Sequence, residues 1–91
     1  MDEGDEKESQ RLLLRTLGSR VRHLRKARKL TLEDVAERAG HNWSASDLSR
    51  FERGTRAINI AKFLWLTEGL GVNASDILYG PPGDVETDDD E

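Results

Sequence analysis

The chain has 91 residues, no cysteine and a formal net charge of −4 at pH 7. This length suits a single small domain, and the lack of cysteine excludes a disulfide framework and a thiolate metal site. His23 and His41 have no ligand-spaced partners, so we expect no metal and no cofactor. No apolar run is long enough to cross a membrane and the acidic start is unlike a signal peptide, so a membrane partner is excluded and a cytoplasmic location is expected.

The net charge conceals a sharp division along the chain. Residues 1–8 carry −4, residues 9–80 carry +6, and residues 81–91 carry −6. Because both ends are rich in charge and poor in apolar residues, we expect a disordered acidic arm over 1–8 and a disordered acidic tail over 81–91. Within the intervening domain, residues 11–29 hold eight positive charges and no acid. Such clustering is typical of a surface that binds a polyanion.

The domain opens with a long predicted helix that starts at Ser9 or Gln10. Gly18 is expected to weaken the middle of this helix. Apolar residues recur at helical spacing along one face. That face carries Leu13, Leu17, Val21 and Leu24.

Residues 30–54 contain two short helical patterns joined by a connection that contains glycine. Thr31 and Asp34 form a variant of the capping box at the start of the first helix. The second helix is expected to start near Ser44 and to stop at Gly54, and it carries serine and arginine on the face that its apolar residues leave free. This arrangement is typical of a helix-turn-helix.

Two more helices are predicted after this unit. The first runs from about residue 60 to residue 70, where an apolar stripe recurs at helical spacing. The stripe consists of Ile60, Phe63, Leu64, Thr67 and Leu70. A short last helix follows near residues 74–79, and the Gly-Pro-Pro-Gly run at 80–83 ends the domain. No segment indicates a strand, so the expected fold class is all-α with five helices.

From about residue 17 to residue 79, the chain resembles the compact five-helix DNA-binding domain of phage lambda-type repressors and the wider xenobiotic-response-element family of small transcriptional regulators. The likeness rests on LGSRVRHLRKARKLTLEDVAERAG, DLSRFERG and LTEGLGVNASDIL, which occur in the expected order. The chain departs from the family in a longer turn, HNWSA at residues 41–45, and in Leu32, which stands where the family often has glutamine.

The resemblance implies a sequence-specific regulator, specifically a repressor, that binds double-stranded DNA at a palindromic operator as a homodimer. Its recognition helix would span about residues 44–53 and lie in the major groove. The residues placed to read bases are Ala45, Ser46, Ser49 and Arg50. Among them, Arg50 has a planar fork that matches guanine O6 and N7. The residues placed to grip phosphates are Arg20, Arg22, Arg53 and Arg56.

The resemblance also places a partly buried ion pair between Arg25 and Glu52. An arginine late in the first helix of phage repressors meets a glutamate late in the third, and an unpaired carboxylate on an inward-packing helix would be costly to desolvate. The homodimer contact is expected on the last two helices. Trp65 occupies a position that is usually polar in the family, and the short last helix is more apolar than it needs to be. The expected contact residues are Trp65, Ile77, Leu78 and Tyr79.

Two alternative functions stay open at this stage. The fold could serve as a protein-interaction adaptor whose acidic tails engage a basic protein partner or imitate DNA, or the chain could be the antitoxin of a toxin–antitoxin operon. No nucleophile elbow and no glycine-rich oxyanion loop is present, so an enzyme is not expected.

Overall fold

The structure is a computed structural model that describes residues 3–40 and 42–80. Five helices make up these ranges, and no strand occurs within them. They are α1 (Glu3–Ala27), α2 (Leu32–Arg38), α3 (Ala45–Glu52), α4 (Ile60–Leu70) and α5 (Ala74–Leu78). The predicted five-helix, all-α class is therefore confirmed. The predicted tail at residues 81–91, the first two residues of the predicted arm and His41 lie outside the described residues.

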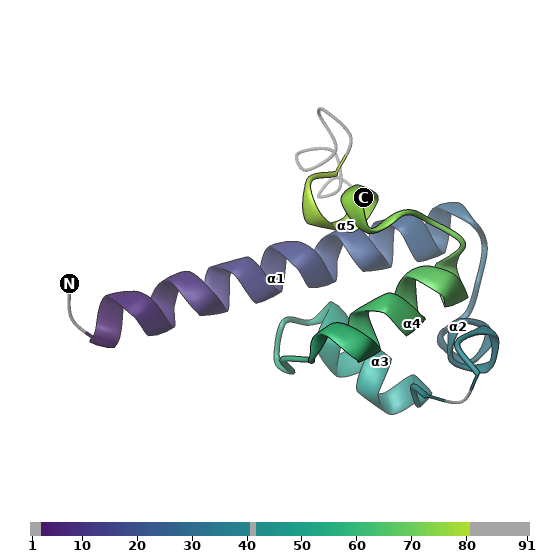
Figure 1. Cartoon of the computed structure of the whole chain (residues 1–91), viewed down its shortest axis with the longest axis horizontal. Helices are drawn as coiled ribbons and strands as arrows, with labels where there is room; N and C mark the ends of the chain where they lie inside the picture. The colour runs from purple at the N-terminus through teal and green to yellow at the C-terminus, as the bar shows by residue number, and fades with distance from the viewer. Residues whose placement is uncertain (1–2, 41, 81–91) are drawn as a thin grey trace.

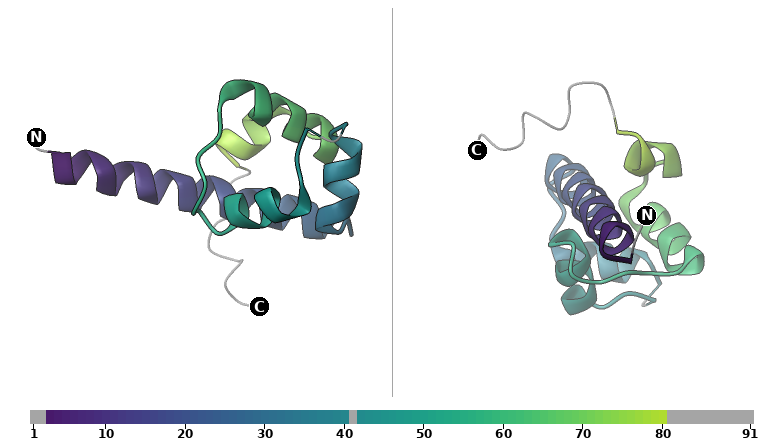
Figure 2. Two further views of the ribbon diagram at one scale, coloured as in Figure 1. Left: turned by 90° about the horizontal axis from the view of Figure 1, so that it is seen from below. Right: turned by 90° about the vertical axis from the view of Figure 1, so that its left-hand side faces the viewer.

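The long helix α1 packs chiefly against α3 and α5, whereas α2 packs against α3 and α4. Helices α2, α3 and α4 lie along one side of its C-terminal half, and α5 lies on the other side (Figure 1). The N-terminal half of α1 projects beyond the other four helices, as the left view of Figure 2 also shows. None of the helices in the described ranges is long and apolar enough to cross a membrane.

Helix α1 begins six residues earlier than the predicted start at Ser9. Residues 3–8, which belong to the predicted arm, form the first turns of α1 in the structure. Glutamate and lysine are good helix formers, and acidic residues near a helix N-terminus interact favourably with the helix dipole. Leu13, which belongs to the predicted apolar face of the long helix, is 56% exposed.

Gly18 does not interrupt α1, contrary to expectation. It lies where α1 crosses the C-terminal end of α3. A Cβ atom added to Gly18 would lie 2.2 Å from the backbone oxygen of Phe51 and 2.7 Å from that of Glu52. The absence of a side chain at Gly18 therefore lets the two helices come into direct backbone contact.

The core is built from all five helices and from Trp43 in the α2–α3 turn. Its fully buried members are Val21, Val35, Leu48, Phe51, Leu66, Leu70 and Ile77. The predicted stripe on α4 was partly wrong, because Ile60 and Leu64 are 71% and 50% exposed whereas Leu66 is fully buried. A Cβ atom added to Gly69 would lie 2.8 Å from the backbone oxygen of Val35. Gly69 and Leu66 are three residues apart and share one face of α4. The face that packs against α2 therefore includes Leu66.

We predict that Gly18→Ala destabilises the fold by ~1–3 kcal/mol, because the new methyl group would overlap the backbone of α3. Helix propensity alone predicts the opposite sign, since alanine is favoured over glycine by ~1 kcal/mol in a helix interior. Chemical denaturation measures the difference. The control is Ser19→Ala, an exposed change one residue along α1, which should leave stability nearly unchanged or slightly raised. A Gly18→Ala protein as stable as the wild type would contradict the close contact.

Candidate nucleic-acid interface

The start of α3 is fixed by a cap and by a buried tryptophan. The Ser44 hydroxyl accepts a hydrogen bond of 3.0 Å from the backbone N–H of Asp47, so Ser44 is the N-cap. Trp43 donates through Nε1 to the backbone oxygen of Lys62 at 2.8 Å and packs edge-on against Phe51 with ring centroids 5.8 Å apart. The Lys62 ammonium lies 4.4 Å from the centroid of the same tryptophan ring. The longer turn is therefore anchored to α4.

Helix α3 buries Leu48 and Phe51 and turns its opposite face to solvent. The exposed side chains on that face are Ser46, Arg50 and Arg53, and Ala45 and Ser49 are half-buried at its edge. The four residues expected to read bases therefore lie on the free side of one short helix, together with Arg53. The bounds of α3 fall within the predicted recognition helix at residues 44–53.

Three positively charged side chains lie close to the Asp47 carboxylate beside the start of α3. One carboxylate oxygen lies 3.4 Å from Arg50 Nη1 and 3.7 Å from Arg56 Nη1, and the other lies 3.4 Å from Lys62 Nζ. Burial pushes the pKa of Asp47 upward, but hydrogen bonds from Lys62 and Ser44 and the positive charges of Arg56 and Lys62 outweigh it, so the pKa is lowered. The ionised carboxylate thus orients Arg50 and Arg56.

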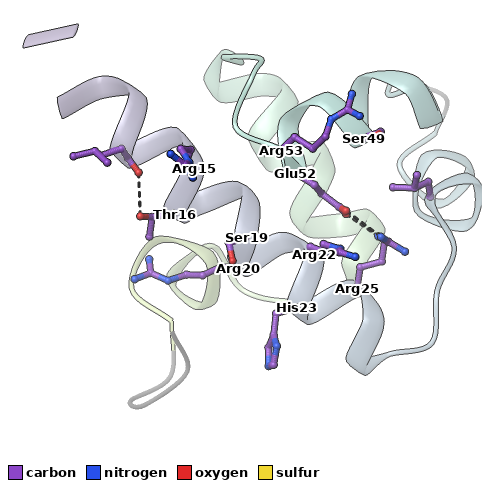
Figure 3. Close-up of a pocket in the computed structure, with 12 residues that line it drawn as sticks. Arg15, Thr16, Ser19, Arg20, Arg22, His23, Arg25, Ser49, Glu52 and Arg53 are labelled. Carbon is purple, nitrogen blue, oxygen red and sulfur yellow. Dashed lines mark hydrogen bonds and ion pairs between the residues drawn. The ribbon is translucent and has the colours of Figure 1, made fainter. Parts of the chain in front are cut away.

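Arg20 is hydrogen-bonded to the end of α5. Its Nη1 donates to the backbone oxygens of Ile77 and Leu78 at 3.0 and 2.7 Å, which satisfies carbonyls at the end of α5. Its guanidinium extends toward α5 (Figure 3). The sequence could not reveal this, because the contact joins residues far apart in the chain.

A groove runs along α1 beside α3 (Figure 3). Five arginines and one glutamate are among its lining residues. They are Arg15, Arg20, Arg22, Arg25, Arg53 and Glu52. The groove is therefore strongly basic and brings together Arg22 and Arg53, two of the residues expected to grip phosphates. Arg15 was not among the residues expected to grip phosphates, although it belongs to the run of positive charges without acids between residues 11 and 29.

The structure brings Arg25 and Glu52 together in a two-pronged ion pair. Arg25 Nε lies 2.7 Å from Glu52 Oε2, and Arg25 Nη2 lies 3.0 Å from Glu52 Oε1. The remaining Arg25 nitrogen, Nη1, donates to the backbone oxygen of Leu30 at 2.9 Å. Hydrogen bonding to Glu52 raises the pKa of Arg25 despite the opposing effect of burial. One guanidinium thus joins α1, α3 and the segment that leads into α2.

The residues expected to form the dimer contact are not all at the surface. Ile77 is fully buried in the core and is not available for a contact between copies, which corrects that prediction. Trp65, Leu78 and Tyr79 are exposed, Tyr79 by 75%. Ile60 and Leu64 add exposed apolar surface on α4 that sequence reasoning had assigned to the core.

Comparison with known proteins gives a consistent set of relatives. The model of the helix-turn-helix domain family matches residues 16–77. The restriction-modification controller protein C.AhdI from Aeromonas hydrophila is 30% identical, with a TM-score of 0.66 over 70% of this chain and 94% of that one. The clp gene regulator ClgR from C. glutamicum is 29% identical, with a TM-score of 0.66 over 72% of this chain and 83% of that one. No curated protein sequence gives a significant match.

We predict that Arg25→Met destabilises the protein by ~3–5 kcal/mol, because it leaves the Glu52 carboxylate buried without its partner. Replacing both residues, as Arg25→Met with Glu52→Leu, should be nearly neutral. A double-mutant cycle based on thermal melts measures the coupling. Arg28→Met, an exposed change nearby, is the control and should fall within about 0.5 kcal/mol of the wild type. Additive losses from the two single changes would show that the pair contributes no coupling energy.

Proposed function

This chain belongs to the helix-turn-helix domain family, in the lambda-repressor-like group of DNA-binding regulators, and on that premise we propose that it is a repressor that binds a palindromic operator as a homodimer. The observation that carries the proposal is the free face of α3. The start of α3 is fixed by Ser44 and Trp43, and the basic groove lies beside α3.

In this proposal, α3 lies in the major groove and Arg50 reads a guanine. The guanidinium donates to O6 and N7 of the base, a pairing that its planar fork matches. Asp47 holds the same guanidinium at 3.4 Å in the free protein, which limits the conformations that Arg50 explores before binding. The hydroxyls of Ser46 and Ser49 bond base edges or phosphate, and the Ala45 methyl packs on a thymine methyl.

Phosphate contacts come from arginines on either side of the recognition helix. Arg53 and Arg22 line the groove between α3 and α1, and Arg56 lies beside the start of α3 through Asp47. These charges carry no sequence information by themselves, but they fix the orientation of the protein on the duplex and make affinity depend on salt.

The homodimer is proposed to form through α4 and the end of α5. The exposed apolar residues there are Ile60, Leu64, Trp65, Leu78 and Tyr79. A two-fold axis through this surface would place two copies of α3 in successive major grooves, with half-sites ~34 Å apart. A symmetric dimer requires a palindromic operator.

Selection of bound sequences from a random double-stranded DNA pool tests the proposal as a whole. Enrichment of a palindrome with two half-sites one helical turn apart is the expected result. The adaptor hypothesis predicts no enriched sequence, because a protein partner would use the fold without reading bases.

We predict that Arg50→Ala weakens binding to the selected operator by ~1–3 kcal/mol and relaxes the preference at one base pair, because a bidentate base contact is lost. Arg53→Ala should instead weaken specific and random DNA alike and reduce the slope of log affinity against log salt by about one. Titrations at two or more salt concentrations distinguish the two effects. Equal losses on specific and random DNA for both variants would refute the division of roles.

We predict that the combined change Trp65→Glu and Leu78→Glu converts the dimer to a monomer, because it places charges in an apolar contact. Both residues are exposed in the single chain, so the fold itself should survive. Sedimentation equilibrium reports the mass, and circular dichroism checks the helix content. Ser46→Glu, which adds a charge on α3 instead, should remain dimeric. A double variant that still sediments as a dimer would refute this assignment.

A further inference from the structure

The projecting half of α1 exposes apolar side chains that the other described helices leave uncovered. Leu12 and Leu13 are each 56% exposed. They lie in the N-terminal half of α1, the half that projects beyond the other helices (Figure 1). Short helical segments are marginal in water, and most helices in proteins are stabilised by burying an apolar face. This half of α1 is therefore the segment of the fold that most lacks a packing partner.

The exposed leucines and the basic groove belong to one continuous face of α1. With 3.6 residues per turn, Leu12 and Leu13 lie on either side of a line through Ser9 and Thr16. Leu12 and Thr16 also line the groove, which continues along α1 past Ser19 to Arg22 (Figure 3). A helix laid along this face would contact leucines first and arginines next.

The charge of α1 changes sign along its length. Residues 1–8 carry −4, and residues 11–29 carry eight positive charges without an acid. Glu6 and Glu8 are exposed in the first turns, whereas Arg15 and Arg22 line the groove further along. A helix with an acidic start and a basic remainder is complementary to a second copy of itself when the two run in opposite directions.

We propose that two copies of this chain pair through antiparallel α1 helices. Leu12 and Leu13 lie at the two-fold axis, and the acidic start of each helix lies in the basic groove of the other copy. An axis between residues 12 and 13 sets residues 3–8 of one copy against residues 17–22 of the other. The same axis places Ser9 of one copy opposite Thr16 of the other.

On the N-terminal half of α1, the charge pattern and the leucines favour a second copy over DNA as the occupant. Phosphates would be repelled by the acidic start of α1, and they offer no apolar surface to cover Leu12 and Leu13. The contact also differs from the proposed dimer surface, which lies on α4 and α5. It does use the basic groove in which Arg22 and Arg53 are proposed to bind phosphates, so pairing through α1 would compete with DNA there. The pairing is tested without DNA, so its failure is distinguishable from failure of the proposed function.

Engineered disulfides test the pairing and its direction, because the chain contains no cysteine of its own. Full-length Ser9→Cys and Thr16→Cys proteins are mixed and mildly oxidised, and linked species are identified by mass. Facing positions on packed helices come close enough for a disulfide. The expected product links position 9 of one copy to position 16 of the other, in excess over either self-linked product. Predominance of self-linked products, or no more product than Ser9→Cys gives with Glu37→Cys on α2, would overturn the proposal.

The contribution of charge is tested in the same assay. Adding Glu6→Lys and Glu8→Lys to both cysteine proteins should reduce the 9–16 product by roughly fivefold or more, since like charges would then meet in the groove. Glu33→Lys and Glu37→Lys change the net charge equally on α2 and should have little effect. Leu12→Glu with Leu13→Glu should abolish the product. Equal losses from both lysine pairs, or a leucine variant that links normally, would contradict the proposed contact.

Discussion

The position of the recognition helix depends on its contact with α1. An isolated helix of eight residues would not be stable in water, so α3 must be held by tertiary contacts. Gly18 lets the two backbones meet, and the Arg25–Glu52 pair joins them with parallel hydrogen bonds of 2.7 and 3.0 Å. Removing one partner of such a pair lowers stability more than replacing both with apolar residues, because the remaining charge stays buried without a counter-charge. The orientation of the reading face therefore depends on residues that never touch DNA in the proposed complex.

The two ends of α3 are held by different contacts. Its C-terminal end rests on α1 through Glu52, whereas its N-terminal end is held by the Ser44 cap and by Trp43, which binds the backbone of α4. Asp47 then orients cations on the outer side of the first turn. Both ends of α3 are therefore fixed by contacts outside the helix itself.

Features encoded within a few neighbouring residues were predictable from the sequence. The capping box of Thr31 and Asp34, the cap at Ser44 and the end of α3 before Gly54 all depend on local chemistry, and the structure has each of them. The Arg25–Glu52 pair was anticipated through resemblance to known repressors. Where the expectations failed, the deciding contact lies between distant segments. The bonds from Arg20 to α5, the burial of Ile77 and the exposure of Leu64 follow from which faces pack together, and periodicity alone cannot show this.

The backbone contact at Gly18 also has a mechanical consequence. From Gly18 back to Glu3, α1 extends as a continuous helix, which at 1.5 Å per residue gives an arm of roughly 22 Å. Because that arm is rigidly joined to α3 at its base, it acts as a lever. A displacement of about 1 Å at the tip corresponds to a tilt of roughly 3° about the crossing point, which α3 would share. A molecule that binds the N-terminal end of α1 would therefore change the orientation of α3 without contacting the DNA-binding surface.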